Sequence, residues 1–287
     1  MKSKEKNNKK CYSPAGFTVI ELLVVIAIIM LMASIVLVGL KNAKDNANMA
    51  SIKRFAAGIK NGLGAYLVAE WTFDGNTLGY CTDVKDESGN NNHATCVGNP
   101  AKPKIVNGII RKAIKLNGTD NYLNVPHSKS LISPTDAITV EAWINPSEAV
   151  SGLGWMILCK GSFHLFYRPQ SPQLIFSVDG FKGCNASYVF QTGKWHHVVG
   201  TYSSSPYAID IFVNGQKLES DGLGPPLRKD IFWNDQPLNI GRYPYYPGNR
   251  FYPGLIDEVR IYSQALNLAQ IQQLYAEGLR KRQIANN

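Results

Sequence analysis

Glu21 is a carboxylate inside an otherwise apolar run that extends from Phe17 to Leu40. An ionised carboxylate at the centre of a bilayer costs about 2.5–3.5 kcal/mol, so such a residue marks a functional position and requires a cationic partner. The run exceeds the roughly 20 residues that span a bilayer, and it lacks the A-x-A-like cleavage site of a secretory signal peptide. We therefore predict a transmembrane helix over residues 17–40 in which Glu21 forms an ion pair.

Two pairs of neighbouring ionisable residues, His196-His197 and Asp257-Glu258, lie in runs with the composition of β-strands. Adjacent strand residues point to opposite faces, so neither pair can act together on one ion or one bond. The sequence also lacks a Gly-x-Ser-x-Gly nucleophile elbow, a phosphate-binding glycine loop and the carboxylate pair on one strand face that glycoside hydrolysis requires. We therefore expect structural roles for these residues and predict that the chain is not an enzyme.

The segment from Gly241 to Gly254 combines five aromatic rings with three prolines and two arginines. Binding residues often lie on loops that a rigid scaffold holds in place. We therefore predict a ligand-binding surface for sugar rings or a protein partner, made of Tyr243, Tyr245, Tyr246, Phe251 and Tyr252. The alternative is that the prolines stiffen a long connection and the rings cover the edge of the fold.

The chain contains five cysteines, and all except Cys11 lie beyond Gly16. An even number of cysteines suits an oxidising compartment. Their spacing favours two local disulfides, Cys81–Cys96 and Cys159–Cys184, although four cysteines allow three pairings. Buried free thiols are the alternative.

The net charge is +9, and five lysines against one glutamate precede Phe17. The remaining basic residues are scattered among glycines, asparagines and aromatic residues. Recognition of nucleic acid calls for a basic stripe on one face, so we predict no nucleic-acid binding by a fixed basic patch.

Several elements must position these residues. Beyond the apolar run, residues 41–69 keep a helical spacing of apolar side chains, which predicts an amphipathic extension of the first helix. From Glu70 onward, short runs of β-forming residues alternate with turn residues, as is typical of a sandwich or jelly roll. Asn214-Gly215 predicts a type I′ hairpin, and residues 265–282 predict a C-terminal helix.

The segment from Gly16 to Ile29 (GFTVIELLVVIAII) resembles the processing motif of type IV pilins and pseudopilins. The resemblance implies that residues 1–16 are a leader, that a prepilin peptidase cleaves after Gly16, and that Phe17 is then N-methylated. It further implies that Glu21 pairs with the N-terminal ammonium of a neighbouring subunit. A buried ion is tolerated when an opposite charge meets it, so Glu21 would set the register of assembly.

Residues 70–278 resemble the laminin-G-like, concanavalin A-like jelly rolls, and a tail of residues 279–287 follows. The resemblance rests on motifs in family order, which include WTFD at 71–74, TVEAWI at 139–144, GKWHHVVGTY at 193–202 and GLIDEVRIY at 254–262. It implies a mainly β fold, an antiparallel sandwich carried on a long N-terminal helix, with a short C-terminal helix.

The same resemblance implies a calcium ion where the first and last strands meet. Carboxylate, amide and carbonyl oxygens are the ligands that calcium prefers. The predicted donors are Asp74, Asp86, Asn90, Asp120 and Asp257. The alternative is that these side chains cap their own turns.

Together these features predict a pilin-like or pseudopilin subunit that joins other subunits in a surface filament or secretion pseudopilus and displays a lectin-like head for carbohydrate or protein. Before assembly the chain would span the bacterial inner membrane, with a cytoplasmic N-terminus and a periplasmic head. The size of the head suggests display or adhesion. One alternative is a periplasmic glycan-binding module that stays anchored and does not polymerise, and another is a secreted glycan-processing enzyme.

Overall fold

The computed structural model describes residues 19–20, 22–34, 62–147, 154–178, 182–222, 231, 235–245 and 250–285. The chain divides into two compact units, residues 1–55 and 56–287. In the first unit, residues 22–34 are helical. Among the described residues, no helix is both long enough and apolar enough to cross a membrane. The predicted transmembrane helix over 17–40 contains this segment and the helical residues 19–20, and its other residues lie outside the described ranges.

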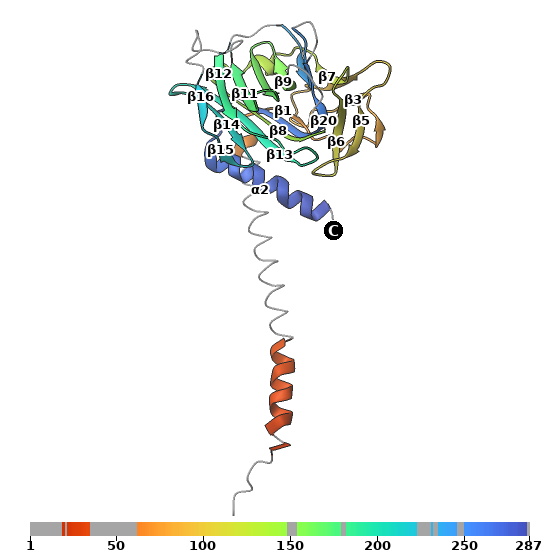
Figure 1. Ribbon diagram of the computed structural model, residues 1–287, viewed down its shortest axis with the longest axis vertical. Coiled ribbons are helices and arrows are strands. Elements are labelled where there is room, and N and C mark those ends of the chain that lie inside the picture. Colours follow the sequence, from red (N-terminus) through yellow and green to blue (C-terminus); the bar gives the residue numbers. More distant parts are fainter. Residues whose placement is uncertain are drawn as a thin grey trace, which may run out of the picture. The chain divides into compact units, whose positions relative to one another are not determined.

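The second unit is a sandwich of two large antiparallel sheets (Figure 1). In the first sheet the described strands follow the order β15 (Gln216–Lys217), β14 (Tyr207–Val213), β13 (His196–Ser204), β8 (Ala137–Pro146), β20 (Pro253–Tyr262), β6 (Lys112–Asn117), β5 (Lys104–Asn107) and β2 (Gly79–Tyr80), and β1 (Leu67–Trp71) also pairs with β20.

In the second sheet the described strands follow the order β16 (Ser220–Gly222), β12 (Lys182–Ser187), β11 (Gln173–Val178), β10 (Phe163–Arg168), β9 (Trp155–Lys160), β17 (Leu238–Ile240), β7 (Tyr122–Val125), β4 (Ala94–Val97) and β3 (Asp83–Val84). A separate hairpin consists of β18 (Arg242–Tyr243) and β19 (Arg250–Phe251). The helical elements are η1 (Ser130–Ile132) and α2 (Leu268–Ala285).

The core lies between the two sheets, because alternate residues of each strand point inward. Its members include Trp71, Val140, Leu165, Phe176 and Ile261, all at most 1 % exposed. Gly200 is required where the sheets meet, since a Cβ at that position would lie 2.3 Å from the ring of Phe176. The predicted fold class, a mainly β antiparallel sandwich with a C-terminal helix, is confirmed.

A second apolar cluster lies on the outer face of the first sheet, where α2 packs. Leu63, at the end of a short helical segment over residues 62–64, is buried in this cluster. The cluster also includes Val199, Phe212, Tyr262, Leu266, Ile271 and Leu274. The short helical segment over residues 62–64 therefore packs, through Leu63, in the same cluster as α2.

Two predicted boundaries are wrong. The helical extension does not reach residue 69, because β1 begins at Leu67 and pairs with β20, which buries Val68 and Ala69. Strand pairing and burial outweigh a helical periodicity that is weak near Gly64. Residues 279–287 are also not a separate tail, since α2 continues to Ala285. The Asn214-Gly215 hairpin is confirmed: both residues have positive φ, 51° and 75°, between β14 and β15.

Candidate functional site

The predicted processing and assembly residues, Gly16, Phe17 and Glu21, lie outside the described residues, as does the leader. The helical segment that follows Glu21, residues 22–34, exposes its large apolar side chains, from Met30 at 69 % to Ile26 at 41 %. Exposed apolar surfaces of this kind mark sites of interaction with proteins or membranes.

The predicted aromatic surface is only partly exposed. Tyr243 is 6 % exposed and Tyr252 is fully buried, whereas Tyr245 is 39 % exposed and Phe251 is half-buried. Tyr246 lies outside the described residues. A buried ring cannot stack on a ligand that arrives from solvent, so the prediction is wrong for Tyr243 and Tyr252.

Packing explains the burial of these two rings. Tyr252 lies edge-on to Trp155 in the core, with ring centroids 6.3 Å apart. Tyr243 packs on the outer face of the second sheet with Met156 and Phe166. The guanidinium of Arg242 lies 4.5 Å from the centroid of the Tyr122 ring, and this cation–π contact stabilises the packing of the hairpin on β7. The rings of Tyr243 and Tyr252 thus cover the fold, as the alternative expected.

A row of polar residues crosses the second sheet at one register level. Strand pairing places in one line Asp83, Thr95, Asn124, Asn239, Cys159, His164 and Ser177. Asp83 and Thr95 are exposed, whereas the last four residues are buried. The His164 ring lies edge-on to that of Tyr243 at 5.4 Å, so the hairpin contacts this row.

The adjacent pair of Cys159 and His164 has the residue types of a nucleophile and its base, but not their electrostatics. Burial raises the pKa of the Cys159 thiol well above its usual value and lowers the pKa of His164 to about 4. The thiolate is the reactive form of cysteine, so a thiol that stays protonated is poorly suited to act as a nucleophile.

His164 predicts a pH dependence of stability. Its pKa of about 4 in the folded chain lies below the ordinary 6.5. As the pH falls, the unfolded chain therefore takes up a proton at this residue before the folded chain does. Stability is therefore complete above pH 6.5 and falls as the pH drops toward 4, by up to about 3 kcal/mol. Urea unfolding of wild type and His164→Gln between pH 7 and pH 4 checks this. The variant should show a flatter profile, and identical profiles would contradict the assignment.

The predicted calcium donors are not brought together. Asp86 accepts N–H bonds from Glu70 and Asn92, and Asp257 accepts them from Ile109 and Ile110. The other three also bond locally: Asp74 with Lys112, Asn90 with the Leu67 and Val68 carbonyls, and Asp120 with Asn99 and Asn117. Within the described ranges, no three Asp, Glu, His or Cys side chains are placed to hold a metal ion. A calcium site stays a prediction that these contacts do not support.

Several of these carboxylates have shifted pKa values. Burial, together with the neighbouring Glu258, raises the pKa of Asp257 well above its usual value. Burial also raises the pKa of Asp74. The hydrogen bond from Asn117 lowers the pKa of Asp120. These shifts follow from local contacts and from burial.

The first sheet carries a buried ion-pair network that the sequence patterns did not reveal. Arg260 donates from Nε to Glu70 at 2.7 Å, from Nη1 to Glu141 at 3.1 Å, and from Nη2 to Glu258. His197 Nε2 lies 3.0 Å from Glu141 Oε1. Burial opposes the charge on Glu141, but Arg260 and His197 hold its pKa below the usual value. The available signal was the charged residues inside strands that are otherwise apolar.

The two histidines have separate structural surroundings, as predicted. His197 faces Glu141, and its ring is tilted by 41° against that of Trp143, with ring centroids 5.1 Å apart. His196 lies instead against the ring of Phe190 at 5.0 Å.

Of the two predicted disulfides, only Cys81–Cys96 forms. Cys159 and Cys184 are buried free thiols, so that pairing is wrong. Strands β10 and β11 separate β9 from β12, which places the two residues about 14 Å apart. A disulfide requires Cα atoms within about 7 Å. Their side chains also belong to different clusters, on opposite faces of the second sheet.

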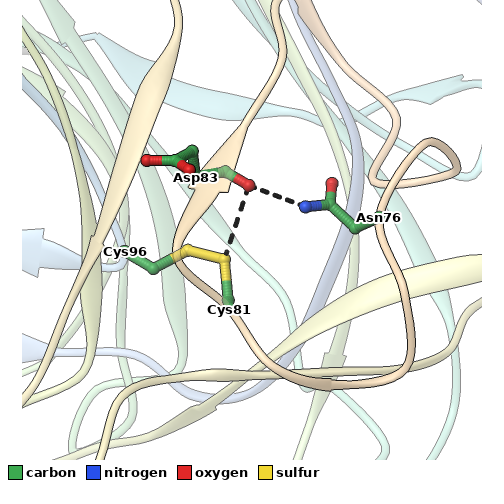
Figure 2. Close-up of a disulfide and its surroundings, with 4 residues drawn as sticks. All are labelled: Asn76, Cys81, Asp83 and Cys96. Atoms are coloured by element: carbon green, nitrogen blue, oxygen red, sulfur yellow. Dashed lines mark hydrogen bonds between the residues drawn. A yellow bond between two sulfur atoms is a disulfide. The ribbon is translucent and has the colours of Figure 1, made fainter.

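A cavity of about 430 Å³ lies beside the disulfide. Its walls are the loop after β1, the edge strand β3, the segment that follows β3, and β4. The lining residues are Thr72, Phe73, Gly75, Asn76, Asp83, Val84, Lys85, Glu87, His93, Ala94 and Thr95. Figure 2 shows how the Asn76 amide approaches Asp83 next to the Cys81–Cys96 bridge, with Nδ2 donating to the Asp83 carbonyl at 2.6 Å.

Comparison with known families agrees with this architecture. The profile of the concanavalin A-like lectin/glucanases superfamily matches residues 117–272, which is more than half of the chain. The chain belongs to this superfamily. A second profile, the prokaryotic N-terminal methylation motif, matches residues 13–37 of this lectin-like chain and agrees with the predicted processing segment. No curated protein matches it significantly.

Solved structures share the fold of this superfamily member. Domain 4 of AbnA, a GH43 extracellular arabinanase from Geobacillus stearothermophilus solved with arabinotriose, is 24 % identical with a TM-score of 0.55; the match covers 73 % of this chain and 98 % of that domain. The binding domain of Paraclostridial Mosquitocidal Protein 1 is 20 % identical (TM-score 0.57; 75 % and 53 % covered). The binding domain of Botulinum neurotoxin DC, solved with SialylT, is 16 % identical (TM-score 0.58; 75 % and 52 % covered). The chain thus spans about half the length of the two toxin domains.

Proposed function

We propose that the chain is a type IV pilin-like subunit that displays a carbohydrate-binding lectin head. A prepilin peptidase cleaves it after Gly16 and methylates Phe17, and it then leaves the inner membrane to join a surface filament or a periplasmic pseudopilus. The observation that carries this proposal is the presence in one chain of the N-terminal methylation motif, residues 13–37, and the lectin-like domain.

The exposed apolar surface of residues 22–34 supports the first half of the proposal. In the membrane that surface contacts lipid, and in a filament it contacts the same helix of neighbouring subunits. Glu21 would then meet the N-terminal ammonium of a neighbour, which compensates the cost of burying either charge alone.

Similar structures support the second half, since one of them was solved with arabinotriose and another with SialylT. We propose binding and not catalysis for the head. In the described region, the buried pair of Cys159 and His164 is held in protonation states that suit neither nucleophilic attack nor proton transfer near neutral pH.

Replacing Glu21 with alanine tests assembly. We expect on the order of a hundredfold less protein in sheared filaments, because the neighbour's ammonium would be buried without a partner at a cost of several kcal/mol. Immunoblots of the sheared and membrane fractions measure this. The matched control is Glu5→Ala, which removes a carboxylate from the leader and should leave assembly unchanged.

Mass spectrometry of the N-terminus provides the second readout. An N-methylated Phe17 is expected in both variants, whereas an intact Met1 would overturn the proposal. Unchanged head function in the membrane, with no filaments from wild type either, would favour the anchored module that does not polymerise.

A further inference from the structure

The cavity beside the Cys81–Cys96 disulfide has rigid walls. The loop after β1 is held from two sides, because Lys112 Nζ donates to the carbonyls of Asp74 and Asn76 while the Asn76 side chain donates to Asp83. On the opposite wall, Asp86 accepts N–H bonds from Ser88 and Asn92, which close the turn after β3, and a third from Glu70 on β1. The disulfide ties the start of this region to β4. A preformed cavity avoids the ordering cost that binding otherwise incurs.

Phe73 lines this cavity and is held in the left-handed backbone region, with φ at 62°. A bulky residue rarely adopts that conformation, and its energetic cost persists only where surrounding contacts impose it. The Phe73 carbonyl accepts a bond from Asn76 N at 3.1 Å, which closes the turn. Backbone strain of this kind is concentrated at ligand-binding and catalytic positions.

The polar groups of the lining have unused hydrogen-bonding capacity. Within the described parts of the chain, the Thr95 hydroxyl has no hydrogen-bond partner, and the Thr72 hydroxyl only accepts a long bond from Asp74 N, at 3.5 Å. His93 Nδ1 accepts the Asp86 N–H at 3.1 Å, so the neutral ring carries its proton on Nε2 and can donate there. Hydroxyl, imidazole and carboxylate groups therefore surround one space.

The lining combines buried apolar residues with mixed charge. Phe73, Val84 and Ala94 belong to the core and are at most 1 % exposed, so the polar residues form most of the surface that a ligand would contact. Lys85 lies 3.6 Å from Glu87, so these two charges offset each other, and Asp83 leaves a slight excess of negative charge. An anion would be repelled, whereas a neutral ligand with many hydroxyls would form hydrogen bonds with these polar groups.

We infer that this cavity binds one or two rings of a neutral saccharide. Its volume, about 430 Å³, lies within the range of about 300–1,000 Å³ that small-molecule sites occupy. The inference rests on the proposed carbohydrate-binding function and assigns that function to the edge of the second sheet, at β3 and β4, and not to the aromatic segment.

The test uses the full mature chain in detergent, with calorimetric titration of glucose, galactose, mannose, arabinose and their neutral disaccharides. Thr95→Arg places a long cationic side chain at the cavity wall and should weaken binding about tenfold or more. The matched control is Thr119→Arg, an exposed threonine outside the cavity, which should bind like wild type. Thr95→Val removes only the hydroxyl and should weaken binding a few-fold, and thermal melts confirm that each variant is folded.

The outcomes separate the inference from the proposed function. If wild type binds a saccharide and folded Thr95→Arg binds it equally well, the cavity is not the site although the head is still a lectin. If wild type binds no saccharide in the panel or on a wider glycan array, the proposed function of the head fails as well. If Thr95→Arg abolishes binding of extended peptides and wild type binds no sugar, the ligand is a peptide paired with edge strand β3, and the inference is overturned.

Discussion

Replacing Arg260 with methionine should lower the free energy of unfolding by about 3–5 kcal/mol at neutral pH. Arg260 is 9 % exposed and contacts Glu70, Glu141 and Glu258, which are at most 6 % exposed. Methionine preserves most of the apolar stem but leaves three buried carboxylates without their main cation. Urea unfolding of the mature chain, followed by tryptophan fluorescence, measures the loss.

The expected loss of stability comes from the buried carboxylates that are left without a cation. Two controls test this origin: removal of an exposed arginine, and a change of pH. Arg282→Met removes an exposed arginine from α2 and should change stability by less than about 0.5 kcal/mol. Lowering the pH protonates the orphaned carboxylates, so the difference between wild type and Arg260→Met should shrink toward pH 4. A loss below about 1 kcal/mol at pH 7 would mean that the ion pairs barely offset their own desolvation.

Removing the Cys81–Cys96 disulfide should cost about 3 kcal/mol, the value expected for closing a loop of about 15 residues. The two cysteines are separated by 15 residues in the chain. The double variant Cys81→Ser/Cys96→Ser should also lose affinity for the saccharide proposed above, since the disulfide supports one wall of the cavity. Denaturant unfolding and calorimetric titration measure the two effects.

A reducing agent provides the control. Dithiothreitol should reduce wild type to the stability of the double variant and leave the variant itself unchanged, because the described part of the chain holds Cys159 and Cys184 as free thiols. Further destabilisation of the double variant by dithiothreitol would reveal a second disulfide and contradict the separation of β9 and β12.

Features that depend on neighbouring residues were predicted well. The β-forming runs of the second unit became strands, and Asn214-Gly215 formed its hairpin, because side-chain alternation and tolerance of positive φ are local properties. The short separation of Cys81 and Cys96 also sufficed to predict their disulfide.

Features that depend on strand order were predicted poorly. Cys159 and Cys184 are closer in sequence than many bridged pairs, yet two strands lie between them. Tyr243 and Tyr252 belong to one aromatic run, but one packs on the outer face of the second sheet and the other enters the core. Sequence spacing gives neither the order of strands in a sheet nor the face that a loop covers.

The sequence by itself determined the apolar segment with Glu21, the β character of the head and the superfamily motifs, since each of these depends only on residues that are contiguous in the chain. Only the tertiary structure brought Arg260 to Glu70 and Glu141, 190 and 119 residues away, and assembled a cavity from loops at β1, β3 and β4. Such sites arise when antiparallel pairing aligns distant strands, and the free energy that drives that pairing comes from burial across the whole sandwich.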